Sequence, residues 1–94
     1  MLICSVYDSK AEAFLRPFMV PTKGVAIRSF SAAVNEERHD FHRHSGDYTL
    51  FVIGTFCEET GKVVGASAYE NLGVATQFLD NDGARNAELY EENV

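Results

Sequence analysis

Residues 47–57 read DYTLFVIGTFC and are the most strand-like stretch of this 94-residue chain. Aromatic and β-branched residues, which favour strands, dominate it. In a strand, alternate side chains point to opposite faces of the sheet, and here both faces are apolar. One face carries Tyr48, Leu50, Val52 and Phe56, and the other carries Phe51, Ile53 and Cys57. The pattern predicts a central strand covered on both faces, or one whose second face is buried in a dimer.

The residues after this stretch predict a hairpin. Residues 58–61 (EETG) form a turn signal in which Gly61 can take a positive φ. Residues 62–64 then return as a short antiparallel partner.

The start of the chain predicts further strands. Residues 1–7 (MLICSVY) form a short apolar run that we expect inside the sheet. Residues 11–21 contain Pro17 and Pro21, and proline lacks the N–H that a central strand or a helix interior requires. This segment is therefore predicted to be an edge strand or an extended segment, with a short helix over residues 10–15 as the alternative.

Two helices are predicted. Thr22 can cap a helix over residues 23–34, in which apolar residues recur near the helical period. Ser67 and Glu70 match a capping box, and apolar residues recur at helical spacing from there to Leu79. We therefore expect a second helix over residues 67–79.

Together these elements predict an α+β fold: a small antiparallel sheet of three to four strands with two helices. Residues 1–80 are expected to form one domain, because domains usually hold about 100–150 residues. Residues 81–94 are acidic and are expected to be a flexible tail, whose Leu89 and Tyr90 could still dock on a partner. No apolar run approaches the ~20 residues that span a bilayer, so we expect no membrane contact and a soluble, intracellular protein.

Candidate catalytic and metal-binding residues are few. Cys4 and Cys57 form no CxxC pair; they could form a disulfide with each other, but free thiols are the expectation. Residues 36–47 are predicted to be a loop, and its His39, His42 and His44 leave three interpretations open: a solvated loop, a metal site or a phosphate contact. No nucleophile motif, phosphate-binding loop or dinucleotide fingerprint is present. We therefore predict a protein that is not an enzyme and that has no catalytic residues, cofactor or metal.

The charge distribution gives one indication of a partner. The net charge is −6, which opposes nucleic-acid binding on average, yet residues 9–35 carry four bases against one acid. Proteins hold single-stranded nucleic acid with lysine and arginine side chains mixed with aromatic rings. The candidate nucleic-acid-binding residues are Lys10, Phe14, Arg16, Phe18, Lys23 and Arg28. The simpler interpretation is that the two rings belong to the core and the charges are solvated.

Three segments resemble a known family. They are residues 6–18 (VYDSKAEAFLRPF), residues 23–35 (KGVAIRSFSAAVN) and residues 47–61 (DYTLFVIGTFCEETG). They are similar to the small non-structural protein of gokushovirus-type microviruses, which are bacteriophages with single-stranded DNA genomes. The resemblance implies a DNA-binding protein of the host cytoplasm that acts in single-stranded genome synthesis and in packaging, with no catalytic residues or cofactor.

We therefore expect a non-structural phage accessory protein that binds single-stranded DNA. The alternative is a non-enzymatic adaptor that binds phage replication, procapsid or host proteins without contacting DNA. We also expect a homodimer, because two helices cannot cover every apolar face of the sheet. The edges predicted to be available for pairing are residues 1–7 and residues 62–64.

Overall fold

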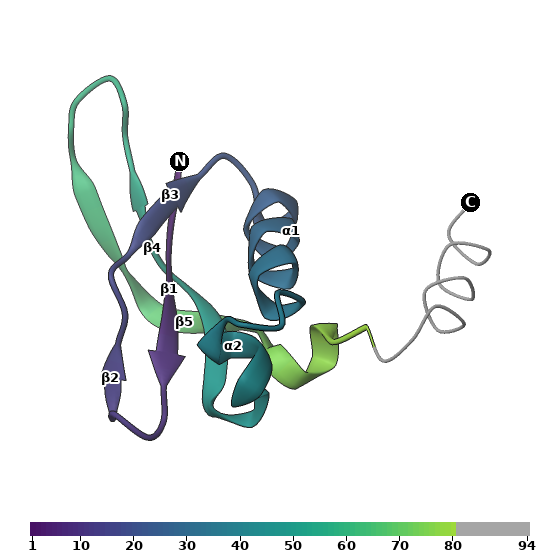
Figure 1. The fold of residues 1–94 in the computed structure, drawn as a ribbon. Helices are drawn as coiled ribbons and strands as arrows, with labels where there is room; N and C mark the ends of the chain where they lie inside the picture. Colours follow the sequence, from purple (N-terminus) through teal and green to yellow (C-terminus); the bar gives the residue numbers. More distant parts are fainter. Residues whose placement is uncertain (81–94) are drawn as a thin grey trace.

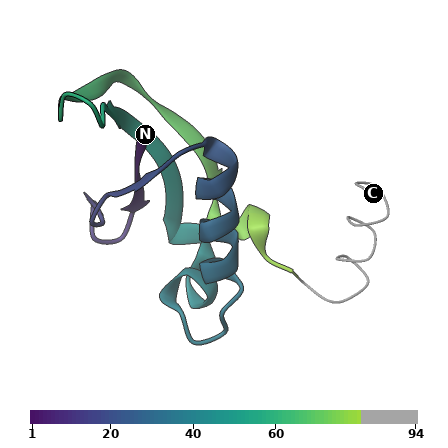
Figure 2. The same cartoon turned by 90° about the horizontal axis from the view of Figure 1, so that it is seen from above.

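The computed structural model describes residues 1–80, which form a curved antiparallel sheet with helices against one face (Figures 1 and 2). The elements in chain order are β1 (Leu2–Asp8), β2 (Ala13–Phe14), β3 (Phe18–Val20), α1 (Lys23–Val34), α2 (Asp40–Arg43), the 3-10 helix η1 (Ser45–Asp47), β4 (Tyr48–Phe56), β5 (Val63–Val74) and the 3-10 helix η2 (Ala75–Phe78). The predicted α+β class is confirmed, with five strands where three to four were expected. No helix within residues 1–80 is long and apolar enough to cross a membrane. The expected tail, residues 81–94, lies outside the described residues.

The two strongest predicted strands lie at the centre of the sheet. The order is β2–β1–β4–β5, with β3 also paired to β1. β1 and β4 pair antiparallel from Leu2 opposite Thr55 to Asp8 opposite Tyr48. Because β1 has neighbours on both sides, the expectation that residues 1–7 offer a free edge is wrong. β5 is an edge strand of this sheet, and the β4–β5 hairpin projects beyond the rest of the molecule (Figure 1).

The proline-containing segment lies at the opposite edge, as expected, and is split into β2 and β3. Pro17 falls between them. The hydroxyl of Ser5, which is fully buried in β1, donates to the Leu15 carbonyl at 2.6 Å, and the Leu15 N–H donates to the Val6 carbonyl at 2.8 Å. These bonds hold the interrupted segment against β1. The alternative of a helix over residues 10–15 is wrong.

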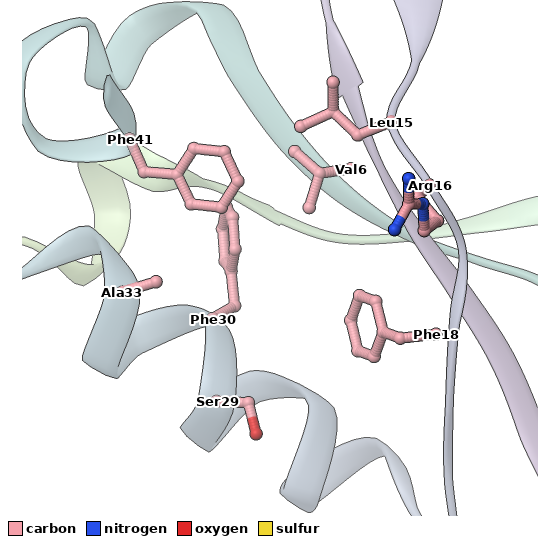
Figure 3. A pocket seen from close by; sticks show the side chains of 8 residues that line it. All are labelled: Val6, Leu15, Arg16, Phe18, Ser29, Phe30, Ala33 and Phe41. Carbon is pink, nitrogen blue, oxygen red and sulfur yellow. The ribbon is translucent and has the colours of Figure 1, made fainter. Parts of the chain in front are cut away.

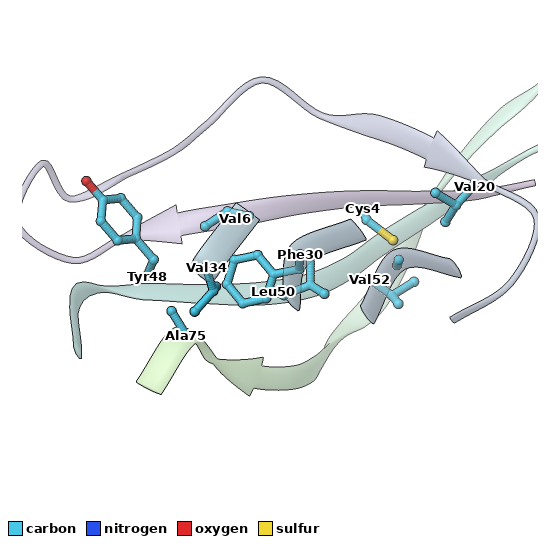
Figure 4. Close-up of a cluster of buried hydrophobic side chains, with 10 residues drawn as sticks. Cys4, Val6, Val20, Phe30, Val34, Tyr48, Leu50, Val52 and Ala75 are labelled. Carbon is cyan, nitrogen blue, oxygen red and sulfur yellow. The ribbon is translucent and has the colours of Figure 1, made fainter. Parts of the chain in front are cut away.

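The core lies between the sheet and α1 (Figure 4). α1 begins as predicted, with the Thr22 hydroxyl accepting from the Val25 N–H at 3.2 Å. The helix buries Ala26, Phe30 and Val34. The strands and η2 contribute the other buried apolar residues, which are Cys4, Val6, Val20, Tyr48, Leu50, Val52 and Ala75. The predicted strand pair and the first predicted helix therefore build one core.

The second predicted helix, residues 67–79, is wrong. Most of that segment is the edge strand β5, which runs well past the short partner expected at residues 62–64, and only η2 is helical. Glu70 does not complete a capping box. It pairs with Val52 in the sheet, and its carboxylate lies 2.9 Å from the Lys23 ammonium. Pairing with β4 therefore overrides a local pattern that sequence spacing alone favours.

The predicted loop over residues 36–47 is also wrong, because it contains α2 and η1. His39 caps α2: its Nδ1 accepts from the Phe41 N–H at 3.0 Å. The Phe41 ring then packs 5.3 Å from Phe30 and 4.7 Å from Tyr48, measured between ring centroids. Packing of this one aromatic ring onto the core gives a polar segment its helical turn.

Candidate nucleic-acid interface

Four aromatic rings lie together on the face of the sheet opposite α1, each from a different strand. We call Tyr7 (β1), Phe14 (β2), Phe51 (β4) and Tyr69 (β5) the aromatic cluster. Phe14 is at its centre, with its ring centroid 4.9 Å from Tyr7, 5.8 Å from Phe51 and 5.7 Å from Tyr69. The rings meet tilted or edge-to-face, which is a favoured aromatic geometry.

Strand alternation explains why these side chains share a face. Val6 and Leu50 point into the core against α1, so their neighbours Tyr7 and Phe51 point to the other face. Phe14 lies opposite Tyr7 in the β1–β2 register and therefore projects on the same side as Tyr7. A row of rings across the sheet follows directly from the antiparallel pairing.

The aromatic cluster remains accessible. Phe14 is 43% exposed and Tyr69 is 52% exposed, whereas Tyr7 and Phe51 are half-buried. Met19, paired with Ile3, adds a further exposed apolar side chain. Exposed rings of this kind can stack on nucleic-acid bases, which present an apolar face whatever their sequence.

The structure separates the six residues that the sequence suggested for nucleic-acid binding. Phe14 belongs to the aromatic cluster, and Lys10 lies exposed in the turn from β1 to β2, after Tyr7 and before Phe14. Lys23 forms an ion pair with Glu70, and Arg28 is exposed on α1. Arg16 and Phe18 line a pocket on the α1 side of the sheet. The basic stretch is therefore spread over both sides of the molecule.

Sequence reasoning did not propose Tyr7, Phe51 and Tyr69 as binding residues. The alternation within residues 47–57 already placed Phe51 on the second face of a strand, so it could have been found. Tyr69 could not, because the predicted helix over residues 67–79 assigned it to a different element.

The pocket that holds Arg16 and Phe18 is open and has a volume of about 250 Å³. Figure 3 shows β1 and the β2–β3 segment on one side and α1 and α2 on the other. Its apolar lining comes from Val6, Leu15, Phe18, Phe30, Ala33 and Phe41. Arg16 and Ser29 supply its polar groups, from opposite walls.

The histidine segment has structural contacts. Besides the His39 cap of α2, His42 Nδ1 lies 3.0 Å from the Val34 carbonyl at the end of α1. Within residues 1–80 no group of three or more His, Cys, Asp or Glu side chains is placed to hold a metal ion. Two of the three histidines therefore have structural contacts: His39 caps α2, and His42 connects α2 to the end of α1.

Two core residues with shifted pKa values lie away from the aromatic cluster. Burial raises the pKa of the Cys4 thiol. Burial, and then the carboxylates of Asp8, Asp40 and Asp47, raise the pKa of the Tyr48 phenol. Neither shift creates a general acid or base near neutral pH. The chemistry that the aromatic face offers is stacking and apolar contact.

Comparison with known proteins identifies the family of the chain. The family model described as Phage ORF5 protein matches residues 1–78, which is most of the chain and nearly all of its described part. No curated protein and no solved structure matches the chain.

Proposed function

The chain belongs to the Phage ORF5 protein family, and on that premise we propose that it is a non-structural phage protein that binds single-stranded DNA through its aromatic cluster. The proposed setting is the host cytoplasm during genome synthesis and packaging of a gokushovirus-type microvirus, as the sequence resemblance implies. The protein would act without catalysis, cofactor or metal.

The aromatic cluster is the single observation that carries this proposal. Proteins that hold single strands without reading their sequence commonly stack bases on aromatic side chains, at ~1–3 kcal/mol per base. Sheets that bind RNA place such rings on strands of an open face. Phe14 and Tyr69 offer exposed rings on this face, and Tyr7 and Phe51 support them from the two central strands.

The four basic side chains of the candidate site determine how much of the binding is electrostatic. Lys10 lies at the end of β1 that carries Tyr7, whereas Lys23 and Arg28 lie on α1 and Arg16 lines the pocket. If all four contacted phosphates, log K against log salt would have a slope near −3, from about −0.7 per contact on single strands. Binding through the aromatic cluster with Lys10 alone gives a slope near −0.7. We expect a slope closer to the second value.

Fluorescence anisotropy with a labelled single-stranded 20-mer tests the proposal. Phe14→Leu with Tyr69→Leu keeps apolar contacts but removes two stacking rings, so affinity should fall about 5- to 150-fold for each base that loses ~1–3 kcal/mol. Leu15→Ala, an exposed apolar residue that lines the pocket on the α1 side of the sheet, is the matched control and should change affinity little. The proposal is wrong if the wild-type chain does not bind at ~50 mM salt, where electrostatic binding is strong, or if the double variant binds equally well.

A protein-interaction adaptor is the second candidate, and the apolar surface favours it. Val63 and Val64 on β5 are 63% and 51% exposed, and the pocket between the sheet and α1 is a second apolar surface. Exposed apolar patches mark protein contacts. Capture of phage or host proteins that survives nuclease treatment supports the adaptor, whereas loss of capture with nuclease supports the DNA-binding function.

We propose in addition that the protein is a homodimer, paired through β5. β5 lies at the edge of the sheet and contains two exposed valines, Val63 and Val64. Its one charged residue, Glu70, is already paired with Lys23. Natural edge strands are usually protected from pairing with another chain by proline, lysine or other charged residues. A second copy could add its own β5 there, as in other isologous contacts.

A further inference from the structure

The apolar pocket between the sheet and α1 has the size of a side-chain site. Its volume of about 250 Å³ is below the ~300–1,000 Å³ usual for small-molecule sites. A cavity of ~150 Å³ holds benzene, so this one can hold one aromatic ring and part of an aliphatic neighbour. The ring of Phe30 and the side chains of Val6 and Ala33 give that occupant apolar contacts.

The pocket also carries a positive charge. Arg16 contributes its guanidinium to the lining and is exposed, and within residues 1–80 the structure shows no ion pair for it. Ser29, on the opposite wall, adds a hydroxyl group. The pocket therefore fits an apolar or aromatic side chain that has a carboxylate next to it.

The chain itself contains such a segment. Residues 88–92 read ELYEE, in which Leu89 and Tyr90 are flanked by three glutamates. Residues 81–94 as a whole carry four acids and one base, a charge of −3. Both the apolar pair and the negative charge complement the pocket.

The segment is long enough to reach it. The Asp80 N–H donates to the Asn35 side chain at 2.7 Å, which fixes the end of the described chain beside the residue that follows α1. Ala33 and Phe30 lie two and five residues before Asn35, or about 3–8 Å along a helix that rises 1.5 Å per residue. The nine residues from Asp80 to Leu89 can span up to ~30 Å.

We propose that residues 88–92 dock in this pocket of the same chain, with Leu89 and Tyr90 against its apolar lining and a flanking glutamate beside Arg16. Such docking holds the acidic segment on the α1 side of the sheet, away from the aromatic cluster. The inference goes beyond the proposed function and does not depend on it.

Amide NMR spectra of the full-length chain test this docking. Leu89→Ala with Tyr90→Ala should shift the signals of Phe18, Phe30 and Ala33, because their environment loses two side chains. Val94→Ala is the control in the same segment and should leave those three signals in place.

A second test changes the pocket instead of the docking segment, by reversing the charge of Arg16. Arg16→Glu should shift the signals of residues 88–92, whereas Arg28→Glu, an exposed arginine of α1 outside the pocket lining, should not. Both arginines are on the surface, so the fold is kept in either variant. Changes confined to the mutated residues and their chain neighbours would overturn the proposal. Shifts that weaken on dilution would overturn docking within one chain, because they would show contact between two copies.

Discussion

Ser5 is a fully buried polar residue in a mostly apolar strand, and its bond to the Leu15 carbonyl is 2.6 Å long. Ser5→Ala removes the donor and leaves a carbonyl without its partner where the edge segment is interrupted. A bond of this kind is worth about 1–2 kcal/mol, so the free energy of unfolding should fall by that amount. Urea denaturation measures it, with Ser67→Ala at an exposed site of β5 as the control. Equal stability of the two variants would contradict the role given to Ser5.

The two thiols should differ in reactivity. Hydrogen bonds from the Thr60 side chain, and then from the Thr60 and Glu59 backbone, lower the pKa of the exposed Cys57 thiol. A lower pKa gives more thiolate at a fixed pH below that pKa, and thiolate is the nucleophile. Cys57 should therefore be alkylated at lower pH than an ordinary cysteine, whereas the buried Cys4 should react only after denaturation.

The pH dependence of the alkylation rate measures this difference. Thr60→Ala removes the side-chain bond, so the midpoint of the rate profile should move to higher pH, and Thr60→Ser should restore it. A midpoint that is the same in all three proteins would show that Thr60 does not control the thiol.

At the scale of elements, Gly73 fixes the passage from β5 to η2. Its φ is +136°, and a Cβ there would lie 2.7 Å from the Phe78 ring. Gly73→Ala should therefore destabilise the protein by about 1–3 kcal/mol, the usual cost of an unfavourable backbone conformation, with the steric clash added. Gly46→Ala is the matched control, since a Cβ at that residue would meet no atom within 4 Å and its φ is not positive. Thermal or urea unfolding of both variants should show the loss only at Gly73.

The same element shows where sequence reasoning stops. α1, β1 and β4 were predictable, because a capping threonine and long apolar runs agree with their tertiary environment. Residues 67–74 carry a capping-box pattern, yet their backbone pairs with β4 and Glu70 binds Lys23. Both partners are distant in sequence, so no local pattern contains them. α2 was missed for the same reason, since its ring contacts are with Phe30 and Tyr48.

The candidate site was predictable only in part. Phe14 was proposed from the basic stretch, and the alternation of residues 47–57 exposes Phe51 on a second face. Which rings share that face depends on the register of the paired strands. Tyr7 and Phe14 lie on the two strands joined by a turn, β1 and β2, and Phe51 and Tyr69 lie on the two strands of the β4–β5 hairpin. The sequence shows that aromatic residues are present, but only the pairing of the strands brings four of them into one cluster.

For the whole molecule, association is the testable quantity. Light scattering coupled to size exclusion should report about twice the chain mass of 10.4 kDa. Val63→Lys with Val64→Lys places charges on the β5 edge, which is how natural sheets prevent pairing. That variant should be monomeric, while Met19→Lys, an exposed residue at the opposite edge, should remain dimeric. A wild-type mass of 10.4 kDa would exclude the dimer.

The pairing of β1 with β4 also sets the order in which the chain can fold as it is synthesised. β2 and β3 pair with β1 from nearby positions in the chain, so this part of the sheet can form once residue 20 has left the ribosome. Pairing on the other side of β1 requires β4, which ends at Phe56. At ~5–20 residues per second, about 2–8 s pass between the emergence of Phe14 from the ribosome and that of Phe56. During that interval Tyr7 and Phe14 lack their neighbours from β4 and β5, so the nascent protein exposes half of its aromatic cluster to chaperones before any complete sheet exists.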